Sequence, residues 1–92
     1  MTGGLVALEV DVTSADEELF SGEASFVLAR TVDGEIGILP GHAPLLAQLV
    51  ESEVKVRESG GGEKRFSISG GFMTVKDDKV IILAEGSEDH EG

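Results

Sequence analysis

The sequence predicts a small all-β fold, an antiparallel β-sandwich, and three features carry this prediction. Apolar residues recur at every second position in most of the chain, which is the period of half-buried strands. Turns rich in glycine or aspartate separate the short apolar runs at the spacing found in sandwiches and barrels. No segment shows the apolar spacing of a long amphipathic helix.

The first strand is predicted from Val6 to Val12, where Val and Leu alternate with Ala7, Glu9 and Asp11. Residues 14–18 are mostly polar and acidic, so an exposed loop is expected there. Three short strands follow, separated by turns at Asp33-Gly34 and Pro40-Gly41: Phe26–Ala29, Ile36–Leu39 and Leu45–Val50.

Two hairpins complete the predicted sandwich. In the first, alternating runs at residues 54–57 and 66–69 flank three consecutive glycines, which form a flexible tip. In the second, Asp77-Asp78 is the turn, because short polar side chains tolerate the positive φ angles of tight hairpins. The residues from Glu85 onward are acidic and lack apolar side chains, so residues 1–85 are predicted as one domain and 86–92 as a disordered tail.

The composition allows one small domain without a deep interior pocket. A chain of 92 residues hides only ~60% of its unfolded surface on folding. Aromatic residues make up 4% of the chain, so the core is expected to consist of Val, Ile, Leu and Ala. These aliphatic residues are expected to surround four phenylalanines, Phe20, Phe26, Phe66 and Phe72.

The net charge of −11 excludes nucleic acid and anionic lipid headgroups as partners, because both repel an acidic protein. It favours a basic protein partner, whose approach the field would accelerate at low salt. The longest apolar stretches fall far short of the ~20 residues that span a bilayer, and no leader segment opens the sequence. We therefore expect a soluble, intracellular protein without membrane insertion.

Side chains with catalytic or metal-binding chemistry are sparse. The sequence has no cysteine and two histidines, His42 and His90, so no metal site is predicted. The glycine run at 60–62 lacks the hydroxyl residue and the helix of a phosphate-binding loop. Most carboxylates occupy outward strand positions, which a solvated surface explains. No catalytic residue and no cofactor is expected.

Residues 33–46 are unusual for a simple sandwich. This segment holds both prolines, His42, and glycines at 34, 37 and 41. Such a mixture of restrictive and permissive residues is typical of a loop with one defined path. The loop is either a contact surface with Glu35 and His42 outward, or a sheet corner whose residues serve backbone geometry alone.

The stretch Gly-Glu-Ile-Gly-Ile-Leu-Pro-Gly-His-Ala-Pro-Leu-Leu, residues 34–46, resembles the signature segment of ATP synthase epsilon subunits of the bacterial type. The resemblance extends to Leu19–Ala24 upstream, and to Ser69–Phe72 and Val80–Glu85 downstream. It covers nearly the whole chain from Leu8 to Glu85.

The resemblance implies a sandwich of about ten short strands and a non-catalytic subunit of the central stalk. Such a subunit packs on the gamma subunit and rests on the polar loops of the c-ring, so that the two turn together during ATP synthesis. It is peripheral, at the cytoplasmic face of the bacterial cell membrane. We expect a monomer when the chain is free.

By position, the resemblance implies that Glu35 faces the basic loops of the c-ring, with Asp33 and His42 nearby on the same lower surface. An acidic loop that meets basic loops gains encounter rate and register. The residues that contact gamma are not assigned by the resemblance.

Epsilon subunits usually continue into two C-terminal helices that restrain ATP hydrolysis and in some members bind ATP. The present sequence ends at Gly92, so neither inhibition nor nucleotide binding is expected of it. Two alternatives stand beside the rotor function. The charge alone would fit a small sandwich adaptor for another basic protein, and the many carboxylates would fit a small acidic hydrolase.

Overall fold

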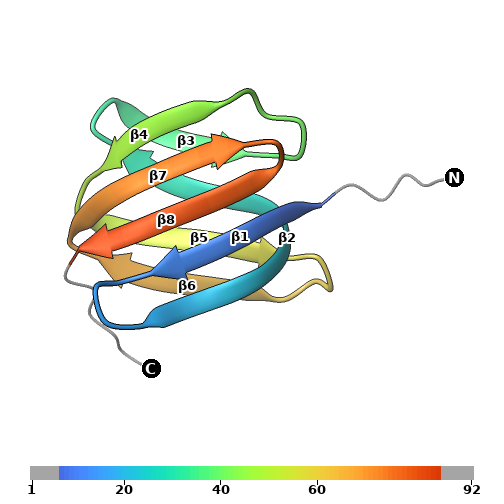
Figure 1. Cartoon of the computed structure of the whole chain (residues 1–92), viewed down its shortest axis with the longest axis horizontal. Helices are drawn as coiled ribbons and strands as arrows, with labels where there is room; N and C mark the ends of the chain where they lie inside the picture. Colours follow the sequence, from blue (N-terminus) through green and yellow to red (C-terminus); the bar gives the residue numbers. More distant parts are fainter. Residues whose placement is uncertain (1–6, 86–92) are drawn as a thin grey trace, which may run out of the picture.

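The computed structural model describes residues 7–85, which form eight β-strands and no helix (Figure 1). The strands are β1 Leu8–Thr13, β2 Glu18–Thr31, β3 Gly34–Ile38, β4 Leu45–Leu49, β5 Ser52–Glu58, β6 Glu63–Ile68, β7 Gly70–Lys76 and β8 Lys79–Glu85. The all-β prediction is confirmed. Val6 and the predicted disordered tail 86–92 lie outside the described residues.

The strands form two layers (Figure 1). The first sheet has the order β1-β8-β7-β4, and the second contains β3, β2, β5 and β6. The 14 residues of β2 join the layers, because the first half pairs with β1 and the second half with β5 and β3. The resemblance implied about ten strands, whereas residues 7–85 form eight, partly because β2 is one long strand that serves both sheets.

The core lies between the sheets and follows the predicted period of two. Leu8, Val10 and Val12 of β1 are fully buried, while Glu9, which lies between the first two, is exposed. Aliphatic residues and Met73 form this core, but no phenylalanine is fully buried. The expectation of a core built around four phenylalanines is therefore wrong. The fully or nearly buried residues are Leu8, Val10, Val12, Ala24, Val27, Ala29, Ile38, Leu49, Val54, Val56, Ile68, Met73, Val75, Val80, Ile82 and Ala84.

The phenylalanines lie around the core instead. Phe20 of β2 and Phe66 of β6 pack against each other with ring centroids 6.1 Å apart, and both contact core residues. Tilted rings at this distance attract each other. Phe26 lies on the outer side of the second sheet under the Arg57 guanidinium, whose Cζ is 5.9 Å from the ring centroid. This distance fits a cation–π contact.

Both predicted hairpins are confirmed. β5 and β6 pair around the glycine tip, where the Glu58 amide donates to the Gly62 carbonyl over 2.7 Å. β7 and β8 pair around Asp77 and Asp78, whose φ angles are 50° and 62°. Two consecutive positive φ angles give a two-residue turn that matches the strand twist. The loop predicted at 14–18 is confirmed for residues 14–17, where the Ser14 amide donates to the Glu17 carbonyl, while Glu18 begins β2.

Candidate functional site

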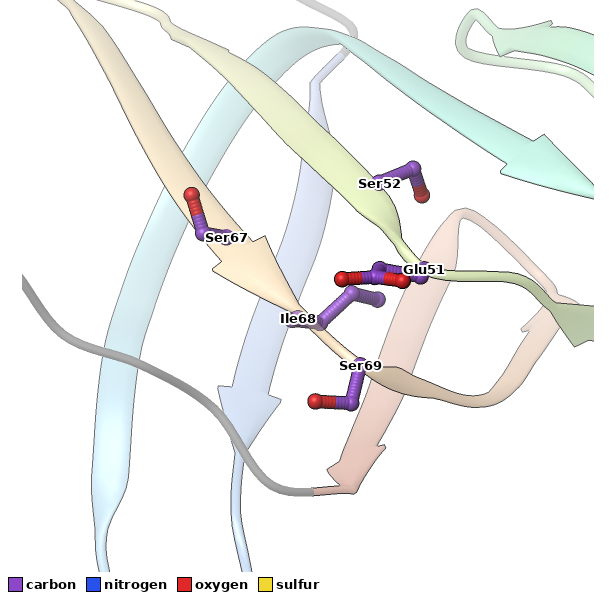
Figure 2. A pocket seen from close by; sticks show the side chains of 5 residues that line it. All are labelled: Glu51, Ser52, Ser67, Ile68 and Ser69. Atoms are coloured by element: carbon purple, nitrogen blue, oxygen red, sulfur yellow. The ribbon is translucent and has the colours of Figure 1, made fainter.

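Residues 7–85 contain no group of three or more His, Cys, Asp and Glu placed to hold a metal ion. One hollow of about 250 Å³ lies beside the ends of β5 and β6 (Figure 2) and is lined by Glu51, Ser52, Ser67, Ile68 and Ser69. The Ser52 hydroxyl donates to the Val50 carbonyl over 2.7 Å, and no histidine lines the hollow to act as a base.

The turn between β2 and β3 is held in one conformation by side-chain and backbone hydrogen bonds. The Thr31 hydroxyl donates to the Gly34 carbonyl over 2.9 Å and accepts from the Asp33 amide over 3.0 Å. The Val32 amide donates to the Gln48 carbonyl of β4 over 3.0 Å. These bonds fix Asp33 at an exposed tip, so its carboxylate is presented from a rigid support.

Glu35 lies two residues further along, on β3. It is exposed and directly opposite Arg30 of β2. The ion pair found among residues 7–85 joins Arg65 and Glu63, so Glu35 is not held by a salt bridge to Arg30 there. Val32, which is 57% exposed, completes a surface that we call the acidic corner: Val32, Asp33 and Glu35.

His42 belongs to a different turn. The His42 amide donates to the Leu39 carbonyl over 3.2 Å, and Gly41 has a φ of 89°. Pro40 and Gly41 occupy the central positions, which is the residue pattern of a type II turn. The Gly41 amide donates to Asp78 Oδ1 over 2.7 Å, which ties the turn to the β7–β8 hairpin. The His42 Nδ1 lies 2.8 Å from its neighbour's carbonyl oxygen.

The structure brings Asp33 and Glu35 together but separates His42 from them. The β2–β3 turn lies at the upper left of Figure 1, and the loop between β3 and β4 at the upper right. The five residues of β3 lie between the two, which corresponds to about 16 Å. His42 therefore lies at the other end of β3 from Asp33 and Glu35, because an extended strand carries the chain away from Glu35, and the common lower surface expected for the three residues stays a prediction.

Sequence analysis missed a hollow at the acidic corner. It measures about 420 Å³ and lies between residues 31–36 and β4, the last strand of the first sheet. Leu46 of β4 is 71% exposed at its rim. In the sequence Leu46 resembles any other apolar strand residue, and only the pairing of β4 with β7 shows that it points outward.

The outer surface of the first sheet is the second feature that sequence analysis missed. Phe72 of β7 and Leu83 of β8 are directly opposite each other, and they are 47% and 54% exposed. Leu46 and the half-buried Ile81 flank Thr74 in the next row of the same surface. We call Leu46, Phe72, Ile81 and Leu83 the apolar face. Contiguous exposed apolar side chains mark protein interaction sites.

A second hollow lies at the end of the apolar face. It measures about 390 Å³ and is bounded by Phe72 and Leu83 on one side and by the β1–β2 loop on the other. The lining residues are Thr13, Ser14, Ala15, Phe72, Leu83, Ala84 and Glu85. Its mixture of aromatic, aliphatic and small side chains could receive an apolar side chain of a partner.

The family model for the β-sandwich domain of the ATP synthase delta/epsilon chain matches residues 7–90. This chain belongs to that family. The matched range includes both the acidic corner and the apolar face.

Bacterial ATP synthase epsilon chains are similar to this chain over most of its length. The ATP synthase epsilon chain of Mycobacterium sp. strain KMS is 50% identical over 82 residues, which are 88% of this chain and 68% of the relative. The epsilon chain of Micrococcus luteus is 49% identical over 80 residues, 87% of this chain and 88% of the relative. The match therefore spans about two thirds of the first relative and nearly nine tenths of the second.

Solved structures of ATP synthases contain the same fold. A chain in the cryo-EM structure of Euglena gracilis mitochondrial ATP synthase, OSCP/F1/c-ring, superposes with a TM-score of 0.84 at 28% identity. The match covers 95% of this chain and 56% of the Euglena chain, so this chain spans little more than half of it. A chain of the Tetrahymena thermophila central stalk and c-ring matches with a TM-score of 0.73 at 24% identity, over 89% and 66% of the two chains.

The epsilon-type sandwich described here contains strands and turns only. Among residues 7–85, no helix is long and apolar enough to cross a membrane.

Proposed function

We propose that this chain is a non-catalytic rotor subunit of a bacterial ATP synthase, which joins the gamma subunit to the c-ring so that the two turn as one body. The observation that carries the proposal is the pair of unlike surfaces on one rigid, family-matched sandwich. The apolar face suits a permanent partner, and the acidic corner suits a basic one. The assemblies named for the Euglena and Tetrahymena matches both include the c-ring, which supports these partners.

The gamma subunit is assigned to the apolar face. Burying exposed aliphatic and aromatic surface contributes roughly 25 cal/mol per Å², so Phe72 and Leu83 are the expected anchors. The neighbouring hollow gives a gamma side chain a place to insert. A subunit that must transmit torque requires a contact that salt does not weaken, and apolar burial provides one.

The c-ring is assigned to the edge that carries the acidic corner. Asp33 and Glu35 lie at one end of this edge on a hydrogen-bonded turn, and His42 lies at the other end. Exposed ion pairs contribute under ~1 kcal/mol each, but they accelerate encounter and fix the register of docking. Asp33 and Glu35 would therefore orient the sandwich on basic loops, with His42 a peripheral contact.

The remaining parts of the proposal follow from the rotor assignment. Residues 1–85 would act as one coupling domain and 86–92 as an acidic tail. The chain would need no metal and no cofactor, because rotation of gamma drives the chemistry elsewhere in the complex. It would sit at the cytoplasmic face of the cell membrane as a peripheral subunit and be monomeric when free.

The first test is titration with the gamma subunit of the same organism at low and high salt, followed by size-exclusion chromatography. A one-to-one complex that persists at high salt is expected. Leu83→Ser and Phe72→Ser should each weaken binding by about tenfold, since a buried anchor contributes on the order of 1.5 kcal/mol or more.

The matched control is Val32→Ser, which removes a similarly exposed apolar side chain from the acidic corner and should leave gamma binding unchanged. Absence of a complex at either salt would contradict the rotor assignment. Equal losses for Val32→Ser and Leu83→Ser would contradict the placement of gamma on the apolar face. A stable complex with an unrelated basic protein instead of gamma would favour the adaptor function.

A further inference from the structure

β3 is an edge strand whose outer backbone groups can be identified. Among the described strands it pairs with β2 alone. The Arg30 carbonyl of β2 accepts from the Val50 amide over 3.1 Å, on the side of β2 that faces away from β3. The opposed pair Arg30 and Glu35 is therefore a non-hydrogen-bonded pair, and the amide and carbonyl of Glu35 point away from β2.

The same alternation applies to Gly37, two residues further along β3. Gly37 is exposed, and because glycine has no side chain, the exposed surface is its backbone. Phe26 covers the outer side of this glycine, where an added Cβ would lie 2.9 Å from ring carbons. Glu35 and Gly37 thus offer two amides and two carbonyls in the spacing that an added strand requires.

The hollow at the acidic corner lies beside this edge, between β3 and β4. Ile36 of β3 and Leu45 of β4 are half-buried in its lining, and Val32 and Leu46 are exposed there. The lining includes the two acids Asp33 and Glu35 but no basic residue. A strand laid along β3 would therefore meet Ile36 and Leu45 on its inner side and the Glu35 carboxylate on its outer side.

We propose that the free edge of β3 receives an extended segment of a partner subunit as an added strand. Side chains of that segment alternate: aliphatic ones enter the hollow beside Ile36 and Leu45, and Lys or Arg lie on the outer side next to Glu35. The inference rests on the proposed function, because it describes how a rotor partner binds the acidic corner. It adds backbone pairing and an apolar anchor to a contact that was assigned by charge alone.

The other edge strand of the second sheet lacks these properties. β6 pairs with β5 alone among the described strands, but Glu63, Lys64 and Arg65 occupy half of it. Phe66, further along the strand, packs on Phe20 of β2. Charged residues along an edge oppose the addition of another strand. The proposal is therefore specific to β3.

The test uses the isotopically labelled full chain and a capped synthetic peptide of about seven alternating Val and Lys residues, the usual length of a strand. Amide hydrogen exchange of Glu35 and Gly37 is measured with and without saturating peptide. Backbone pairing should slow exchange at both amides by about tenfold or more. The Arg30 and Val27 amides of β2 serve as internal references that should not change.

A peptide with N-methylated Lys residues is the matched control. The residue opposite Glu35 in an added strand has its side chain on the outer side and its amide directed at β3, so methylation of the Lys amides removes the pairing and retains the charge. The control should neither bind with comparable affinity nor slow exchange. Equal binding of the two peptides would overturn the proposal.

Two variants separate charge from backbone pairing. Glu35→Gln retains the amide and should weaken peptide binding only a few fold, with the loss confined to low salt. Glu35→Pro removes the outward amide, which an edge strand tolerates, and should abolish protection at Gly37. Circular dichroism shows whether Glu35→Pro folds. If it does not fold, the proposal is tested by amide exchange of the wild-type chain with the unmethylated and the N-methylated peptide.

The outcomes distinguish this inference from the proposed function. If gamma binds but the peptide leaves Glu35 and Gly37 unprotected, the strand-addition proposal fails and the rotor assignment stands. If the peptide protects these amides but gamma does not bind, the rotor assignment fails and the edge remains a strand acceptor. Protection that rises with protein concentration in the absence of peptide would show that a second copy occupies the edge, and would overturn the choice of partner.

Discussion

Gly71 shows how a single residue determines the path of the chain between the two sheets. It lies at the start of β7, directly after the link from β6, with a φ of 142°. A Cβ at this position would overlap the carbonyl oxygen of Leu83 on the neighbouring strand. Both the backbone conformation and the space therefore require glycine at this position.

We expect Gly71→Ala to lower the free energy of unfolding by about 2–4 kcal/mol, because a rigid backbone atom, and not a mobile side chain, would have to move. Gly60→Ala is the control, since a Cβ there would meet open space. Gly60→Ala should change stability by less than ~1 kcal/mol. Urea unfolding measures both variants, and equal effects would show that the β6–β7 link adapts more readily than its geometry indicates.

At the scale of elements, the β7–β8 turn connects three parts of the fold. Asp78 has a φ of 62° within the turn. Its side chain accepts the Gly41 amide of the loop between β3 and β4, and its carbonyl accepts the Glu9 amide of β1 over 2.8 Å. The hairpin thereby helps to fix the loop that carries His42. Sequence analysis identified the turn but not these tertiary contacts.

We expect Asp78→Ala to destabilise the domain by about 1–2 kcal/mol, since alanine lacks the acceptor for Gly41 and tolerates positive φ poorly. Asp78→Asn should retain most of the stability, because an amide oxygen can accept the same bond and asparagine adopts this conformation readily. Thermal unfolding compares the two variants. Amide exchange at Gly41 adds a local readout, which should accelerate for Asp78→Ala alone.

At the scale of the whole molecule, acidic and apolar side chains are segregated. Residues 7–29 contain six Asp and Glu and no Lys or Arg, so one flank made of β1 and the first half of β2 is strongly negative. Glu9 and Glu23 are directly opposite each other on this flank. Like charges in such positions repel, which costs stability at low salt. The apolar face on the first sheet is thus bordered by charge that discourages self-association.

The proposed contact between the acidic corner and the c-ring gives a prediction for the assembled enzyme. Glu35→Lys should lower proton-driven ATP synthesis and ring association at low salt, by up to about fivefold, because a contributing exposed charge pair is worth under ~1 kcal/mol. Glu9→Lys, an equal charge change on β1, which pairs with the opposite half of β2, should have little effect. Unchanged coupling for Glu35→Lys would remove Glu35 from the ring contact.

The sequence by itself determined most strands, both hairpin turns and the family resemblance, but it placed the start of the second strand at Phe26, whereas β2 begins at Glu18. These features depend on local patterns: the period of two in residues such as Val10 and Val12, the paired aspartates at 77–78, and the segment 34–46. Local patterns can be recognised in a sequence because they depend only on residues that are close together in the chain. The structure and the family match confirmed them.

Only the tertiary structure decided what each strand presents to solvent and to its neighbours. Phe72 reads as a core residue, but the pairing of β7 with β8 places it outside. Glu35 and His42 are seven positions apart in sequence, but β3 is extended and separates them. The free edge of β3 depends on a hydrogen bond between Arg30 and Val50, 20 positions apart. Burial, edges and hollows arise from which strands pair, and that pairing depends on contacts between residues distant in the chain.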